Sequence, residues 1–215
     1  AIPTTYSGSE MTPIWGLTED GIKTTGRDPN VLAKCVIYDP ALTIGLPADV
    51  SATSGMNALA HAVEALYAVD ANPIASTMAE QCIAALAHSL PRVIANPADL
   101  DARAEALYGA WLAGAVLGLV NIALHHKLCH TLGGTFDLPH AGVHTVVLPH
   151  AAAYNANAAP AAMAAIAAAL GSANAPSGLF DLAQSIGAPT TLKALGMKEA
   201  DLDRAADLAV AKPYP

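Results

Sequence analysis

The chain has 215 residues, 53% of them hydrophobic and 13% charged, with a formal net charge of -8. These values exclude a disordered protein and predict a soluble globular chain of one or two domains with a substantial core. Because the negative charge offers no basic footprint for nucleic acid, an anionic ligand must be met by a few local cations or helix N-termini. We therefore expect no nucleic-acid partner.

The cysteines and the apolar segments indicate where the protein works. Cys35, Cys82 and Cys129 form neither a CxxC pair nor an even framework, which favours buried thiols in a reducing compartment. No basic segment followed by an apolar one opens the sequence. The most apolar stretch, 109–124, contains Asn121 and is shorter than the ~20 residues of a membrane span. We expect a buried helix there, a cytoplasmic protein and no membrane association.

Residues 1–50 carry two short strand-like runs, at 14–18 and 35–39, bounded by Gly, Asp and Pro. Two strands alone make a piece that is only marginally stable in water. We therefore expect segment 1–50 to complete a sheet whose other strands lie outside this sequence.

From Ser51 onward the pattern becomes helical, with predicted helices at 51–70, 74–95, 99–121, 123–133 and 142–156. In the Ala-rich stretch 151–175, Met163, Ile166 and Leu170 recur at helical spacing and predict two closely packed helices of small residues. A helix near Ala211 runs abruptly into the final residues 214–215. We expect 51–215 to be an all-helical domain that is truncated at its C-terminus.

The densest polar cluster is histidine-rich, because six of the eight histidines fall between residues 125 and 150. His126 and His130 lie four residues apart and share one helix face, a spacing that suits metal binding or a pair of proton donors. A lone buried histidine is usually a hydrogen-bonded core residue, but that reading does not explain this clustering. The cluster therefore predicts a functional site.

A second candidate motif spans residues 54–64. Asn57 and His61 share a helical face, and Glu64 follows one turn later. By itself the signal is weak, since an Asn near a helix start is usually a cap.

These motifs carry a family resemblance. Segments 3–10, 38–40, 55–64 and 126–140 follow, in order, the motifs of the iron-containing alcohol dehydrogenases, and the chain resembles that superfamily over nearly its whole length. The resemblance implies an α+β fold: residues 1–50 end an N-terminal α/β dinucleotide-binding domain, and 51–215 form the helical catalytic domain of a homodimer. It also implies that the positions of the metal-binding Asp and three His are Asn57, His61, His126 and His140. The Asp is missing.

The Asn-for-Asp change and segments 7–18, 64–68 and 125–134 resemble the maleylacetate reductase branch. This implies reduction of the C=C bond of maleylacetate, a dicarboxylate, to 3-oxoadipate by NADH or NADPH in aromatic-compound degradation. One local mismatch is Gly142-Val143, where that branch has an acidic residue followed by Thr.

The missing carboxylate affects the expected mechanism. The replacement of Asp by Asn57 removes one negative charge from a cation site, although three histidines can suffice for zinc. Hydride addition to a C=C bond conjugated to a ketone gives an enolate, which needs less electrophilic help than an alkoxide. We therefore expect that metal is not required, that His126 and His130 donate hydrogen bonds nearest the reacting centre, and that His61 and His140 complete the pocket.

Substrate and cofactor contacts follow from the same resemblance. We expect Asn57 and Lys127 to bind the substrate, although a solvated surface lysine fits Lys127 equally well. The loop beside the cofactor corresponds to Thr4, Thr5, Ser7, Gly8 and Ser9, and Lys23 stands where relatives have a basic residue at the dinucleotide. The glycine-rich phosphate loop of the relatives is not in this sequence.

Two other readings remain open at this point. One is a metal-dependent alcohol dehydrogenase of the same superfamily that tolerates Asn57 as a ligand. The other is a non-catalytic helical module that binds a partner through an exposed face.

Overall fold

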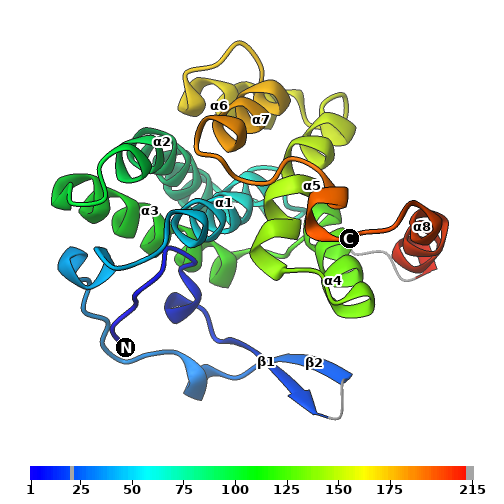
Figure 1. Cartoon of the computed structure of the whole chain (residues 1–215), viewed down its shortest axis with the longest axis horizontal. Helices are drawn as coiled ribbons and strands as arrows, with labels where there is room; N and C mark the ends of the chain where they lie inside the picture. The colour runs from blue at the N-terminus through cyan, green and yellow to red at the C-terminus, as the bar shows by residue number, and fades with distance from the viewer. Residues whose placement is uncertain (20–21, 212–215) are drawn as a thin grey trace.

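The computed structural model describes residues 1–19 and 22–211, without the side chains of 18, 19 and 22–25. Within these residues it is mainly helical, with one two-stranded sheet (Figure 1). The elements are β1 (Ile14–Glu19), β2 (Ile22–Arg27), α1 (Ala48–Ala65), α2 (Pro73–Ala95), α3 (Leu100–Leu119), α4 (Leu124–Phe136), α5 (His140–Asn155), α6 (Pro160–Leu170), α7 (Ala175–Ser185) and α8 (Leu202–Ala211). The predicted α+β class, with helices after residue 50, is confirmed.

The hairpin β1–β2 is antiparallel and extends away from the helices in Figure 1. Ile14 stands opposite Arg27, and the Arg27 guanidinium donates a 2.6 Å hydrogen bond to the Gly118 carbonyl at the end of α3. The predicted strand at 14–18 is thus confirmed, but its partner is the unpredicted run 22–27. The hairpin leads from the N-terminal loop to the helical body.

The predicted strand at 35–39 is wrong, since this segment forms no strand. Among the described residues, its extended part pairs with Ala1, which donates to the Cys35 carbonyl and accepts from the Ile37 N–H, and the Asp39 carbonyl accepts from Leu42 in the following 3-10 turn. A single residue cannot supply a ladder of hydrogen bonds, so an extended apolar run stays irregular here.

Helix α1 lies at the centre of the helical body and packs against α2, α3 and α5 (Figure 1). Every residue from Ser54 to Ala65 is buried, which is the pattern of a helix surrounded by others. Small residues dominate it, so the neighbouring helices approach closely: a Cβ on Gly55 would overlap Leu90 of α2. The polar residues of α1 between Ser54 and Ala65 are therefore buried.

The Ala-rich stretch 151–175 differs from its prediction. It contains the last turn of α5 and all of α6, which ends at Gly171 in the left-handed region with φ 65°. Helix α6 packs against α2 and α7. The stretch therefore contributes one complete helix, and α7 begins at its end.

The predicted buried helix at 109–124 is broken. Helix α3 ends at Leu119, and Asn121 is tied to Asp70 by two 2.9 Å hydrogen bonds, from its backbone N–H and from its side-chain amide. Helix α4 then leaves at 100° to α3. This sharp turn brings the start of α4 against the end of α1.

One stretch, Pro160–Ser185, is long and apolar enough for a membrane span by length and composition. It consists of α6 and α7, of 11 residues each, whereas a spanning helix needs ~20. Length and composition are weak evidence in such a case, and the prediction of no membrane association stays a prediction.

Candidate functional site

A pocket of about 240 Å³ lies where the N-terminal loop and β1 meet α1, α4 and α5. It gathers histidines from three helices that are far apart in the sequence. Its lining residues are Ser7, Ser9, Thr12, Ile14, Trp15, Gly16, Asn57, His61, Leu117, Ile122, His126, His130, His140 and His144.

Glu64, near the end of α1, organises the start of α4. Helix α4 has no side-chain cap of its own, because its N-cap residue is Ala123. The Glu64 carboxylate takes that role, accepting from the backbone N–H groups of Ala123 at 3.1 Å and His125 at 2.7 Å. A buried anion at a helix N-terminus satisfies otherwise unpaired N–H groups and the helix dipole.

The same carboxylate holds His126. Its Oε2 lies 2.5 Å from His126 Nδ1, and both side chains are almost fully buried. Burial alone would raise the pKa of Glu64, but the hydrogen bond from His126, the neighbouring imidazoles and the backbone N–H groups outweigh it and hold the pKa below its usual value. Glu64 is therefore ionised and fixes the Nδ1 proton of His126.

The other face of His126 looks into the pocket. Its Nε2 is buried and has no hydrogen-bond partner among the described residues. His61 stacks on the ring at 5.1 Å between centroids, and His130 meets it edge-on at 5.9 Å. With Nδ1–H directed at Glu64, a neutral His126 presents a lone pair to the pocket, and only its imidazolium form donates there.

Two further histidines form a hydrogen-bonded pair, of which His144 lines the pocket and His125 lies behind it. His125 Nε2 of α4 lies 3.1 Å from His144 Nδ1 of α5, and Cys129 Sγ lies 3.5 Å from the same His125 nitrogen. Burial, reinforced by His126, lowers the pKa of His125 to about 3. Burial and the adjacent histidines likewise hold the pKa values of His61 and His144 well below normal, so these rings are neutral near pH 7.

The hydroxyl-rich loop at residues 4–9 packs directly on α3. Gly8 has φ 75°, and a Cβ there would lie 2.2 Å from the Ala110 carbonyl oxygen. Gly114 makes the reciprocal contact, since its Cβ would lie 1.9 Å from the Gly8 oxygen. Only glycines permit this approach, which holds Ser7 and Ser9 at the rim of the pocket.

A buried arginine anchors the same loop. Arg103 of α3 is 1% exposed and donates to the Tyr6 hydroxyl at 2.8 Å and to the Pro97 carbonyl at 2.6 Å. Tyr6 in turn donates to Thr43. The loop is thus fastened to the helical body by a hydrogen-bond network that includes a buried cation.

Most residues predicted for the site converge in the structure. Asn57, His61, His126, His130, His140, Ser7 and Ser9 all line the pocket. Gly8 allows the loop to pack closely on α3, while Thr4, Thr5 and Lys127 are not among the described lining residues. Lys23 lies in β2, and its side chain is outside the described part of the chain. The roles given to these residues stay predictions.

Sequence reasoning did not single out His144 or the role of Glu64. Glu64 stands in the 55–64 motif, and His144 belongs to the histidine cluster at 125–150, but their importance depends on contacts between α1, α4 and α5 that spacing within one helix does not reveal. Trp15 and Ile122 add apolar surface to the pocket; Trp15 lies in the 7–18 segment of the resemblance, and Ile122 gave no signal.

The ligand-equivalent residues fit a divalent metal poorly. Asn57 Oδ1, His61 Nδ1 and His126 Nε2 are buried and have no hydrogen-bond partner within residues 1–19 and 22–211, but the oxygen is an uncharged amide and the nearby Glu64 carboxylate is already engaged. Among the described residues, ligand atoms converge within 4.8 Å only at His125, Cys129 and His144. The donor set that relatives use for metal therefore lacks its anion.

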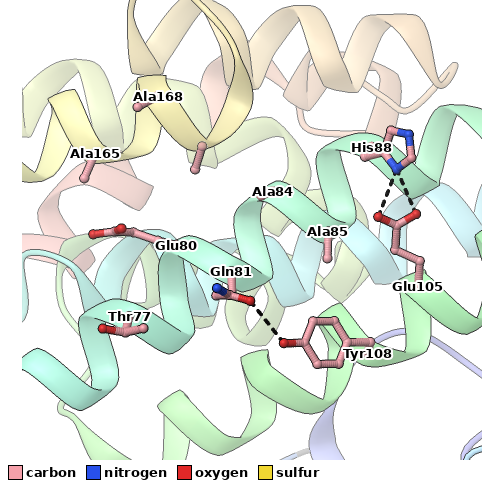
Figure 2. Close-up of a pocket in the computed structure, with 11 residues that line it drawn as sticks. Thr77, Glu80, Gln81, Ala84, Ala85, His88, Glu105, Tyr108, Ala165 and Ala168 are labelled. Carbon is pink, nitrogen blue, oxygen red and sulfur yellow. Dashed lines mark hydrogen bonds and ion pairs between the residues drawn. The ribbon is translucent and has the colours of Figure 1, made fainter.

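A larger hollow of about 670 Å³ lies between α2, α3 and α6 (Figure 2). His88 there faces Glu105 at 2.8 Å, and Tyr108 donates to Gln81. Glu80 and Glu105 give it negative charge, and alanines form much of the remaining wall. Carboxylates repel a dicarboxylate or a dinucleotide, so the histidine pocket is the better candidate for such ligands.

Comparisons with known proteins agree with the motifs. Residues 51–214 match the family model described as Fe-containing alcohol dehydrogenase family, C-terminal. The chain is 62% identical over 214 residues to the maleylacetate reductase of Sphingobium indicum, and 62% identical over 215 residues to that of Pseudomonas sp. strain P51. It matches the crystal structure of maleylacetate reductase from Rhizobium sp. strain MTP-10005 with a TM-score of 0.96 at 56% identity. All of this chain is covered in each case, and 61% of each relative.

Proposed function

The chain belongs to the Fe-containing alcohol dehydrogenase family, and we propose that it carries the catalytic histidine pocket of a maleylacetate reductase. The observation that carries this proposal is the combination of 62% identity to maleylacetate reductases with a buried histidine pocket in which Asn57 replaces the metal-binding carboxylate. The chain spans about three-fifths of the length of those relatives. We further propose that a dinucleotide-binding domain with a glycine-rich loop completes the active enzyme, and that residues 1–50 are its end.

The proposed reaction is reduction of the C=C bond of maleylacetate. A bound nicotinamide cofactor would supply the hydride for the carbon β to the ketone. The π electrons move through the conjugated system to the ketone oxygen, and a proton then adds to the carbon next to the ketone, giving 3-oxoadipate. The pocket has to exclude water and stabilise charge on that oxygen.

The side chains of the pocket suit these tasks. Buried imidazoles offer donors in a site where hydrogen bonds are stronger than in water, and each such group typically contributes a factor of ~10²–10⁴. His126, held by Glu64, gives a lone pair when neutral and a proton when charged, while His61, His130 and His140 surround it. We propose that these histidines act in place of a metal.

Recognition of the substrate and cofactor belongs to the same proposal. NADH or NADPH binds to Ser7 and Ser9 at the rim of the pocket and to Thr4, Thr5, Gly8 and Lys23. The dicarboxylate substrate binds to Asn57 and Lys127. The proposed enzyme works in the cytoplasm as a homodimer, in the degradation of aromatic compounds.

The test is a product analysis with the complete enzyme, including its cofactor-binding domain. Maleylacetate is incubated with NADH or NADPH carrying deuterium at the transferred position, and the product is identified by mass spectrometry. We expect 3-oxoadipate with one deuterium on the carbon β to the ketone. Reduction at the ketone, or no turnover with either cofactor, would contradict the proposal.

A further inference from the structure

His144 of α5 is a buried histidine of the pocket that has no role in the proposed reaction so far. It is 1% exposed, lines the pocket, and has ring contacts with His126 at 4.9 Å and with His140 at 4.4 Å. Its Nδ1 is engaged with His125, whereas its Nε2 is buried and has no hydrogen-bond partner among the described residues. An unpartnered polar atom in a pocket wall marks a place where a ligand group can bind.

His125 lies one layer further in. It is fully buried and is not among the described lining residues. Its Nε2 faces both His144 Nδ1 and Cys129 Sγ, and its Nδ1 is buried with no hydrogen-bond partner in the described part of the chain. His125 therefore reaches the pocket through two lining residues, the hydrogen-bonded His144 and the adjacent ring of His126.

The hydrogen bond between two neutral rings allows two proton arrangements, because each ring carries one N–H. In the first, His125 Nε2–H donates to His144 Nδ1, so His144 carries its proton on Nε2. In the second, His144 Nδ1–H donates to His125, so the His125 proton sits on Nδ1.

The surroundings distinguish the two arrangements. The second leaves the Nδ1–H of His125 in the protein interior with no acceptor, and it makes the Cys129 thiol and His144 compete for one lone pair. The first arrangement leaves only the lone pair of His125 Nδ1 in the interior. The N–H on His125 Nε2 then faces both His144 Nδ1 and the Cys129 sulfur, and the unpaired N–H, on His144 Nε2, points toward the pocket. Buried unpaired N–H groups are rarer and costlier than unpaired acceptors.

We propose that His144 is a catalytic hydrogen-bond donor: its Nε2–H binds the ketone oxygen of the substrate, and His125 is the positioning residue that fixes this tautomer. This inference rests on the proposed function. As the hydride reaches the β carbon, negative charge develops on the ketone oxygen, and the Nε2–H stabilises it without transferring a proton. His144 remains neutral throughout, and the final proton at carbon comes from another acid, for which His126 paired with Glu64 is placed.

The same group of side chains could instead bind a metal ion. His125 Nε2, His144 Nδ1 and Cys129 Sγ lie within 4.8 Å of one another and could ligate zinc. The hydrogen-bond chain accounts for their spacing with neutral rings and a protonated thiol, whose pKa burial raises well above its usual value. The two assignments make different predictions for the ring protons.

The first test reads the tautomers directly and needs no substrate. The complete enzyme is labelled with [¹⁵N]histidine, two-bond ¹H–¹⁵N spectra are recorded, and the His144 signals are assigned by their loss in His144→Gln. We expect Nε2–H on both His144 and His125. An Nδ1–H on His144, or zinc in stoichiometric amount that is lost in Cys129→Ala, would overturn the proposal.

The second test compares three variants of the complete enzyme. His144→Leu should lower kcat by ~10²–10³-fold, the usual effect of losing one donor to a developing oxyanion. His144→Gln keeps an N–H near the Nε2 position and should stay within ~10-fold of the parent. The control is His150→Leu, an exposed position on the same helix, which should change kcat by less than ~2-fold.

These experiments separate the two proposals. If the parent enzyme does not reduce maleylacetate, the proposed function fails while the tautomer result still stands or falls by itself. If the parent is active but the folded His144→Leu variant keeps more than a third of its kcat, the donor role is wrong and the proposed function survives. Should the leucine variant fail to fold, a loss of more than ~100-fold in the folded glutamine variant would equally contradict the donor role.

Discussion

Asn57 is the pocket residue that stands where the family resemblance implies a metal-binding carboxylate. It is 6% exposed, its Oδ1 has no hydrogen-bond partner among the described residues, and it shares the pocket with His61, His126 and His140. Replacing the amide by a carboxylate adds the missing negative charge next to three imidazoles. The change should therefore alter both metal affinity and the binding of an anionic substrate.

We predict that Asn57→Asp in the complete enzyme binds a divalent cation that the parent does not. Without metal, the new carboxylate should raise the KM for maleylacetate, because two unit charges ~6 Å apart repel by roughly 3 kcal/mol at an effective dielectric near 20, before screening. Elemental analysis and kinetics with and without zinc measure both effects. Asn157→Asp, an exposed site with the same charge change, is the control; equal metal content in the two variants would show that residue 57 does not face the histidines.

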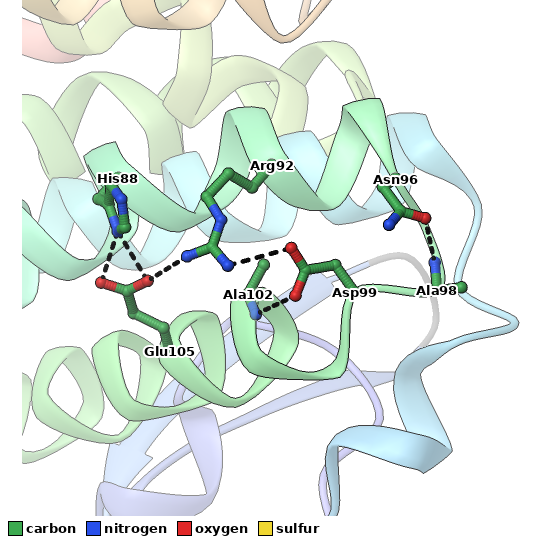
Figure 3. Close-up of polar contacts among 7 residues, drawn as sticks. All are labelled: His88, Arg92, Asn96, Ala98, Asp99, Ala102 and Glu105. Carbon is green, nitrogen blue, oxygen red and sulfur yellow. Dashed lines mark hydrogen bonds and ion pairs between the residues drawn. The ribbon is translucent and has the colours of Figure 1, made fainter.

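The two glutamates with histidine partners offer a matched comparison. Glu64 is buried and caps α4, whereas Glu105 lies on the surface with His88, Arg92 and Asp99 (Figure 3). Removing one partner of a buried ionic network costs several kcal/mol, while exposed pairs contribute ~0–1 kcal/mol.

We predict that Glu64→Gln lowers the free energy of unfolding by roughly 2–5 kcal/mol and also reduces kcat, since His126 loses the acceptor that fixes its tautomer. Glu105→Gln should cost less than about 1 kcal/mol and leave kcat unchanged. Urea denaturation and steady-state kinetics of the two variants provide the measurement. Similar small losses in both would mean that Glu64 does not hold the start of α4.

Among the elements, α3 supports the N-terminal loop through a contact between two glycine backbones. Gly8 and Gly114 meet so closely that a methyl group on either must displace backbone atoms. Gly118, one turn further along α3, has only ordinary contacts, the nearest being 3.7 Å from Pro13. Gly114 and Gly118 are thus two glycines on the same helix that differ in how tightly their surroundings are packed.

We predict that Gly114→Ala destabilises the protein by roughly 1–3 kcal/mol through overpacking and raises the KM for the cofactor, as the loop with Ser7 and Ser9 moves. Gly118→Ala should be neutral or stabilising by up to about 1 kcal/mol, because Ala favours the helix. Thermal unfolding and cofactor titration check both. An unchanged Gly114→Ala variant would contradict the seating of this loop on α3.

Local signals explain which elements could be predicted from the sequence. Helices α2 and α3 begin as expected because Asn72 and Asp99 cap them, with side chains that accept from backbone N–H groups three residues later. The separate helices predicted at 99–121 and 123–133 match α3 and α4, but the hydrogen bonds from Asn121 that fix the break between them depend on Asp70, far away in the sequence. The absent strand at 35–39 was over-predicted because an apolar run does not reveal whether a partner strand exists.

The residues of the site could likewise be predicted where local motifs mark them, but not where tertiary packing defines them. Asn57, His61, His126 and His140 could be identified from motif positions, and the described pocket joins them. The pairing of His125 with His144 and the capping by Glu64 arise only when α1, α4 and α5 pack together. At Gly142, the site of the local mismatch, a Cβ would lie 2.8 Å from the end of the Leu195 side chain, a contact that is likewise invisible in the sequence.

At the scale of the whole molecule, several buried ionisable groups make stability depend on pH in one direction. The pKa values of His61, His125 and His144 are lowered by burial, so below pH 6.5 the unfolded chain binds protons that the folded chain excludes. The pKa of Glu64 is lowered too, so its contribution is complete above its unfolded value of 4.5 and is lost as the pH falls through its folded value. Both effects favour unfolding in acid.

We predict that the free energy of unfolding is smaller at pH 5.5 than at pH 7.5. His125, whose pKa is held at about 3, should contribute a loss of about 1.4 kcal/mol at pH 5.5, and His61 and His144, whose pKa values burial also lowers, should add to the loss in the same direction. Urea denaturation at the two pH values measures the difference. Equal stabilities would show that these rings are not buried and neutral in the folded protein.

The proposal of histidine donors in place of a metal concerns the whole enzyme and can be tested in one experiment. The complete enzyme is dialysed against a strong chelator, its metal content is measured, and the rate of maleylacetate reduction is compared with that of the untreated protein. We predict full activity at a metal content far below one ion per chain. Loss of activity that one specific divalent ion restores would contradict the account.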